Sequence, residues 1–88
     1  MRYEVVLAGP AEAYLHRLDS RMRQRIFVRL EQIANDPFAP RLTTALTSPE
    51  GRRSARVGDY RIVFRVDSEA VVVNVSAIGP RGRVYRDR

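Results

Sequence analysis

The chain has 88 residues and is strongly basic, with sixteen arginines, no lysine, ten acidic residues and a net charge of +6. This length predicts one domain, residues 1–88, with room for a single modest hydrophobic core. The absence of cysteine excludes disulfides and Cys-ligated metal sites. No apolar run approaches the length of a membrane span, and the amino terminus lacks a signal-peptide pattern, so we expect a cytoplasmic protein without membrane association.

The first half of the chain predicts a strand followed by two helices. Apolar and polar residues alternate over residues 2–7, which indicates a half-buried strand. Pro10 suits the first turn of a helix that runs to Leu18. Ser20 is the expected N-cap of a second helix, since its hydroxyl can accept a free amide of the first turn. That helix should end at Asp36, because the residue before a proline is pushed out of helical geometry.

A long loop and then three strands are expected after the helices. Residues 37–51 hold three of the five prolines, and Leu42 and Leu46 are the expected anchors of this loop. The strands that follow are one ending near Val57, one from Tyr60 to Val66 after the tight turn Gly58-Asp59, and one from Val71 to Ile78, the most apolar and therefore expected to be central.

The order β-α-α-β-β-β predicts an α+β fold, in which a helical hairpin packs on one face of a small, mostly antiparallel sheet. In the second of the three strands Ile62 and Phe64 should face the core. Successive side chains of a strand point to opposite faces, so Arg61 and Arg65 should lie on the other side of the sheet.

Positive charge is concentrated in the second half of the chain. Residues 51–88 hold nine arginines against four acidic residues, whereas residues 1–50 are nearly balanced. The planar guanidinium can donate two parallel hydrogen bonds to one phosphate. An arginine-rich sheet face therefore indicates nucleic acid as a ligand.

The residues available for catalysis are few. His16 is the only histidine and is expected on the surface, and no spacing of acidic residues suggests a metal site, so we expect no cofactor and a metal-independent activity. RNA carries its own nucleophile, the 2′-hydroxyl, so its cleavage needs only alignment, charge stabilisation and proton transfer. Arginine can stabilise the charge but is too basic to act as an ordinary base. Tyr85, between Arg83 and Arg86, could carry the proton if neighbouring cations favour its phenolate; alternatively its ring only anchors the tail.

The segments ARVGDYRIVFRV and IGPRGRVY, together with the layout of the rest of the chain, resemble toxins of the RelE/ParE superfamily. The resemblance implies a RelE-like fold and a toxin of a type II toxin–antitoxin system that cleaves mRNA, often on the ribosome, and that is neutralised by a cognate antitoxin. It also implies catalytic roles for Arg61 at the scissile phosphate, for Arg81 as a second catalytic arginine, and for Tyr85 in proton transfer.

Further arginines are expected to bind RNA around these residues. They are Arg52, Arg53, Arg56, Arg65 and Arg83, although strand alternation points Arg53 to the opposite face. The chain departs from the family pattern at Ser54, where some members have a basic residue, and at Pro80, where many have a histidine or basic residue.

Two alternatives to the nuclease stay open. A ParE-like toxin has the same fold but inhibits DNA gyrase by binding, and such members generally lack the set Arg61, Arg81 and Tyr85. A degenerate member would bind only its antitoxin and operator DNA, and it would be expected to have lost these three residues.

Overall fold

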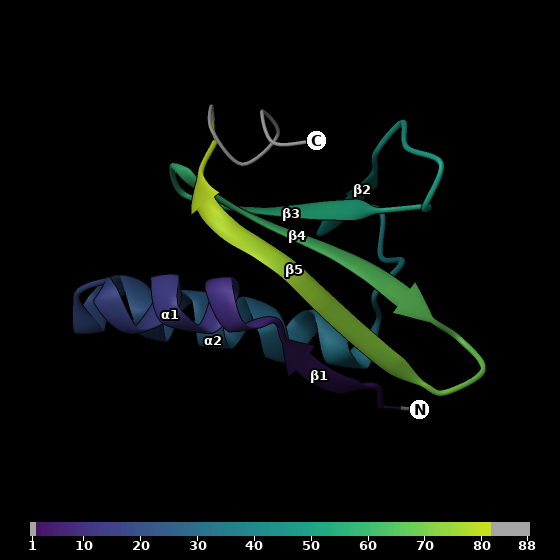
Figure 1. Cartoon of the computed structure of the whole chain (residues 1–88), viewed down its shortest axis with the longest axis horizontal. Coiled ribbons are helices and arrows are strands. Elements are labelled where there is room, and N and C mark those ends of the chain that lie inside the picture. Colours follow the sequence, from purple (N-terminus) through teal and green to yellow (C-terminus); the bar gives the residue numbers. More distant parts are fainter. Residues whose placement is uncertain (1, 82–88) are drawn as a thin grey trace.

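The computed structural model describes residues 2–81 as two helices and a five-stranded sheet (Figure 1). In chain order the elements are β1 (Glu4–Leu7), α1 (Gly9–Arg17), α2 (Ser20–Asn35), β2 (Thr43–Ala45), β3 (Arg53–Val57), β4 (Tyr60–Asp67) and β5 (Val72–Pro80). No helix in this part of the chain is long and apolar enough to cross a membrane.

The strands lie in the order β1-β5-β4-β3-β2. The helices carry the chain from β1 back across the sheet, so β1 pairs with β5 in parallel, while the other neighbouring strands are antiparallel. The predicted α+β fold with a mostly antiparallel sheet is confirmed. The strand expected to be central, β5, has a neighbour on both sides, although β4 is the middle strand.

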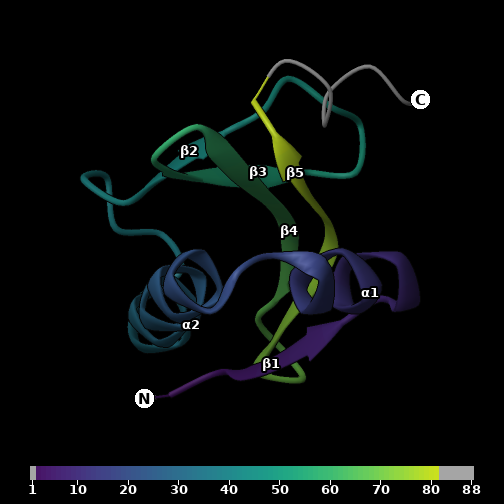
Figure 2. The same ribbon diagram turned by 90° about the vertical axis from the view of Figure 1, so that its left-hand side faces the viewer.

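Both helices pack on the same side of the sheet, as Figures 1 and 2 show. Their inner faces supply Leu15, Ile26 and Ile33, and β4 supplies Ile62 and Phe64, all fully buried in one cluster. The predicted inward direction of the β4 residues is confirmed. Each such side chain contributes roughly 1.5–3 kcal/mol when it is buried, so this cluster is the main source of stability.

The N-cap of α2 is Asp19 rather than Ser20. Asp19 Oδ1 accepts a hydrogen bond of 2.9 Å from the Met22 amide, and Ser20 is the first helical residue. The prediction was wrong by one position because aspartate and serine cap equally well. Aspartate also adds a negative charge at the positive end of the helix dipole.

The segment after α2 was expected to be a loop throughout, and this is wrong at β2, whose three residues pair with β3. The expected anchors Leu42 and Leu46 are half-buried, whereas Pro37 and Thr43 are buried. Thr43 Oγ1 donates a hydrogen bond of 3.0 Å to the Pro37 carbonyl oxygen. A strand this short has no alternation long enough to be recognised in the sequence.

The start of the chain is tied to α2 by a paired ion contact. Arg2 donates two hydrogen bonds to the Glu31 carboxylate, at 2.7 and 2.8 Å. The hydrogen bonding from Arg2 and its positive charge lower the pKa of Glu31 below its usual value. Both side chains are exposed, so the pair adds only modestly to stability.

Candidate nucleic-acid interface

The sheet face opposite the helices, hereafter the open face, is not covered by any helix in the described part of the chain (Figure 2). Alternation along β3 and β4 brings Arg56, Arg61 and Arg65 to this face. Their alternating neighbours, Val57 on β3 and Ile62 and Phe64 on β4, belong to the core cluster on the other side. The predicted basic sheet face therefore exists.

One row of the open face is formed by Arg56 on β3, Arg61 on β4 and Gly79 on β5, which are direct cross-strand neighbours. Arg56 is exposed, and its Nε donates to the Gly58 carbonyl oxygen at 3.2 Å. Like charges directly opposite each other destabilise a sheet pair. The arrangement therefore favours an anion between the two guanidinium groups rather than a role in stability.

Ser54 positions Arg61. Its side chain is buried, and its hydroxyl oxygen accepts a long hydrogen bond of 3.3 Å from Arg61 Nη1. Ser54 lies opposite Val63, which is also buried although it faces away from the main core. The two residues lie beneath the arginines. At the position where some family members have a basic residue, Ser54 therefore contributes a hydrogen bond to Arg61 and no charge.

Arg81 directly follows β5 and is exposed. Its backbone amide donates to the Asp59 carbonyl oxygen at 2.9 Å, which fixes the chain beside the turn between β3 and β4. Gly79, two residues before it, pairs with Arg61. The structure thus brings Arg61 and Arg81, predicted as the catalytic arginines, to the same end of β4 and β5.

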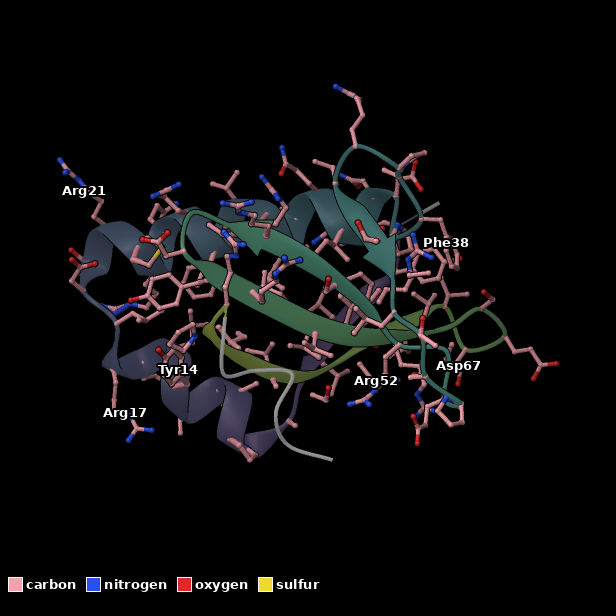
Figure 3. The ribbon with its side chains drawn as sticks, turned by 90° about the horizontal axis from the view of Figure 1, so that it is seen from above. Tyr14, Arg17, Arg21, Phe38, Arg52 and Asp67 are labelled. Carbon is pink, nitrogen blue, oxygen red and sulfur yellow. The ribbon has the colours of Figure 1, made fainter. Side chains whose placement is uncertain are left out.

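Arg52 and Arg65 form a second basic group further along the sheet. They line a hollow of about 370 Å³, and Arg52 Nε lies 3.7 Å from the Glu50 carboxylate. Arg65 is four residues from Arg61 on the same strand, roughly 13 Å away at the usual rise. Figure 3 shows Arg52 toward one end of the molecule's long axis, away from Arg17 and Arg21 at the other end.

Arg53 does not join these residues, and its predicted role in RNA binding is not supported by its position. It pairs with the core residue Phe64 and therefore points to the helix side of the sheet. There Arg53 Nη2 donates to Thr43 Oγ1 at 2.9 Å, and the guanidinium carbon lies 5.2 Å from the centre of the Phe38 ring. Arg53 thus holds the segment after α2 against the sheet.

Two of the predicted site residues, Tyr85 and Arg83, lie outside the described residues. His16 is exposed on α1, 3.8 Å from Glu12, which confirms that it is a surface residue. Within residues 2–81 no three histidine or acidic side chains gather as a metal site would require.

The sequence reasoning missed a second basic surface on α2. Arg21, Arg25 and Arg29 line a hollow of about 600 Å³ together with Gly58 of the turn between β3 and β4. Arg29 Nη1 also donates to the Arg56 carbonyl oxygen at 2.6 Å, which joins this surface to the open face. The spacing of four residues between these arginines, which places them on one side of a helix, was the available signal.

Comparison with known proteins agrees with the fold. The sequence profile of the ParE toxin of the type II toxin–antitoxin system parDE matches residues 5–85. No curated protein sequence is similar enough to be identified as a relative.

Several solved toxin structures are similar to this chain. The toxin–antitoxin complex RelBE2 of Mycobacterium tuberculosis contains a chain with 27% identity and a TM-score of 0.77, over 92% of this chain and all of that one. The isolated RelE toxin of E. coli has 25% identity and a TM-score of 0.77, over 94% of this chain and 90% of that one. The RelE–RelB complex of Pyrococcus horikoshii OT3 shares the fold, with a TM-score of 0.80 at 23% identity over 94% of this chain and 99% of that one.

The family profile spans nearly the whole chain, from β1 to beyond β5. The fold agrees with solved toxins along almost their full length. This chain therefore belongs to the RelE/ParE superfamily of toxins from type II toxin–antitoxin systems.

Proposed function

We propose that this toxin is an endoribonuclease that cleaves mRNA on the open face, in the cytoplasm and on translating ribosomes. The observation that carries the proposal is the position of Arg61 and Arg81 at the same end of β4 and β5, with Arg56 directly across from Arg61. In this proposal, three guanidinium groups of the open face form the site for a phosphate that gains negative charge in its transition state.

The proposed reaction uses the nucleophile of the substrate. The 2′-oxygen attacks the adjacent phosphorus, the bond from phosphorus to the 5′-oxygen breaks, and the products are a 2′,3′-cyclic phosphate and a 5′-hydroxyl. Arg61, held by Ser54, grips the non-bridging oxygens, and Arg81 stabilises the charge that develops on them. Tyr85 takes the proton of the 2′-hydroxyl and returns one to the leaving oxygen. This scheme requires no metal ion or other cofactor.

A cognate antitoxin is the proposed partner. The complexes from M. tuberculosis and E. coli contain a RelB antitoxin bound to the toxin. For this chain we expect the antitoxin to contain an acidic segment that folds when it binds. Its negative charge would neutralise the arginines of the open face while the toxin is inhibited.

Inhibition of DNA gyrase is the second candidate function, and one observation favours it: the matching family profile is that of a ParE toxin. Arg61 and Arg81 favour the nuclease, since gyrase-binding members of the family generally lack them. Induction of the toxin in cells separates the two functions. A nuclease gives new RNA ends by primer extension and leaves plasmid supercoiling intact, whereas a gyrase inhibitor relaxes the plasmid and leaves the RNA whole.

The residues are tested with purified protein and ribosome-bound mRNA. Arg81→Lys keeps the charge but loses the two-pronged geometry, so cleavage should fall by at least about tenfold. Arg17→Ala, on the exposed end of α1, is the control and should cleave as the wild type does. Full activity of Arg81→Lys and of Arg61→Ala would refute the proposed site.

A further inference from the structure

The hollow of about 370 Å³ that contains Arg52 and Arg65 is lined by apolar and polar residues as well as by these arginines. The apolar side chain of Val6 on β1 contributes to its wall, and Val6 is 43% exposed. Ala8 and Val75 also line it, and its polar lining residues besides the arginines are Glu50, Asn74 and Ser76. An apolar surface with a few convergent polar groups is typical of a small-molecule site, and the volume lies within the usual range for one.

A β-bulge shapes this hollow. The pairing of β4 with β5 shifts between Val63 and Phe64, so that Val63 pairs with Ala77 and Phe64 with Val75, leaving Ser76 as the extra residue. The Ser76 hydroxyl donates to the Val63 carbonyl oxygen at 3.3 Å. Bulges re-aim side chains and are frequent beside functional sites.

The charged residues of the hollow are only loosely engaged with each other. The 3.7 Å between Arg52 Nε and the Glu50 carboxylate is too long for a hydrogen bond, and this nitrogen is buried without a hydrogen-bond partner among the described residues. Rearrangement of Glu50 toward a ligand would therefore break no strong contact. An arginine beside an open hollow can also stack its planar guanidinium on a nucleobase.

We propose that this hollow binds one base of the RNA that flanks the cleaved bond, and that Glu50 and Asn74 select a base with an exocyclic amino group against uracil, which has none. The inference rests on the proposed nuclease function and adds its sequence preference. The carboxylate of Glu50 can only accept hydrogen bonds, so it favours an amino group on the base. The Asn74 amide supplies one acceptor and two donors for the same base edge. Arg52 and Arg65 hold the base or its phosphate, about 13 Å along the sheet from Arg61.

The test measures cleavage of a randomised single-stranded RNA pool, on ribosomes and free, with the cut sites read by sequencing. The wild type should disfavour uracil at one position near the cut. Glu50→Gln and Asn74→Ala should each reduce that discrimination about tenfold, the size expected for one lost base contact, while the total cutting rate changes less. The matched controls Glu69→Gln and Asn35→Ala, at exposed positions that do not line the hollow, should keep the wild-type preference.

A binding measurement keeps the inference testable without cleavage. Short 2′-O-methyl oligonucleotides of adenine and of uracil are titrated while the NMR signals of the Asn74 side-chain amide are followed. Saturable shifts with the adenine oligonucleotide and weaker ones with uracil are expected. The base site would be refuted by an unchanged cutting preference in both variants, or by an Asn74 signal that does not shift when oligonucleotide is added. Neither result would contradict the proposed nuclease activity. A protein that binds adenine here but cuts no RNA would instead refute the nuclease.

Discussion

Removal of one guanidinium from the open face should reduce the salt dependence of RNA binding by a definite amount. Five arginines of the described residues lie on this face or directly after β5 at its end: Arg52, Arg56, Arg61, Arg65 and Arg81. Arg52 lies beside Glu50, so four are expected to contact phosphates. Each contact with single-stranded RNA contributes about 0.7 to the slope of log affinity against log salt, which gives about −2.8.

The perturbation is Arg61→Ala, which should reduce the slope to about −2.1. Between 50 and 200 mM salt the affinity of the wild type should fall about 50-fold, and that of the variant about 20-fold. Since Arg61 is half-buried and bonded to Ser54, the variant should lose less than about 1.5 kcal/mol of stability. Fluorescence anisotropy with a 2′-O-methyl RNA, which binds without being cleaved, measures the slope.

Two control variants carry the same loss of charge. Arg17 is the last residue of α1 and lies toward the end of the molecule away from Arg52 (Figure 3), so Arg17→Ala should keep the wild-type slope. Arg53→Ala should also keep the slope, but it should lower the melting temperature, because Arg53 holds Thr43 on the helix side of the sheet. If Arg17→Ala flattened the slope as much as Arg61→Ala does, the binding would reflect net charge and not the open face. A wild-type slope near zero would show that the face does not bind phosphate.

Three further predictions concern catalysis, stability and pH. Tyr85→Phe should slow cleavage about 100- to 10,000-fold in a single-turnover assay with RNA affinity unchanged, and wild-type activity would remove the tyrosine from the mechanism. Thr43→Val should lose roughly 1–3 kcal/mol in urea unfolding, because it leaves buried polar groups without their partner, whereas the exposed Thr44→Val should change stability by less than about 0.5 kcal/mol. The lowered pKa of Glu31 means that its pair with Arg2 stabilises the fold above the usual glutamate pKa and is lost as pH falls through the lowered value. The small difference in melting temperature between wild type and Glu31→Gln should therefore shrink from about pH 5 to about pH 3, and a growing difference would contradict the pairing.

Local patterns in the chain were enough to predict most elements and the existence of a basic face. In β4 the alternation of Ile62 and Phe64 with Arg61 and Arg65 determines two opposite faces without any knowledge of the neighbouring strands. The helices were likewise predicted from their periodic apolar residues. The cap of α2 was misplaced by one position, because Asp19 and the serine after it have equal capping ability.

The tertiary structure alone decided which residues meet. Strand register depends on pairing between distant segments, so no local pattern places Arg56 opposite Arg61 or Ser54 beneath it. The direction of Arg53 follows from alternation, but its contact with Thr43 requires β2, which is too short to be predicted. The hollow beside Arg65 depends on a bulge and on a parallel strand from the other end of the chain. The sequence therefore determined which residue types could form a site, and long-range strand pairing determined which of them meet. The reason is that contacts between distant strands depend on the packing of the whole sheet and not on any single segment.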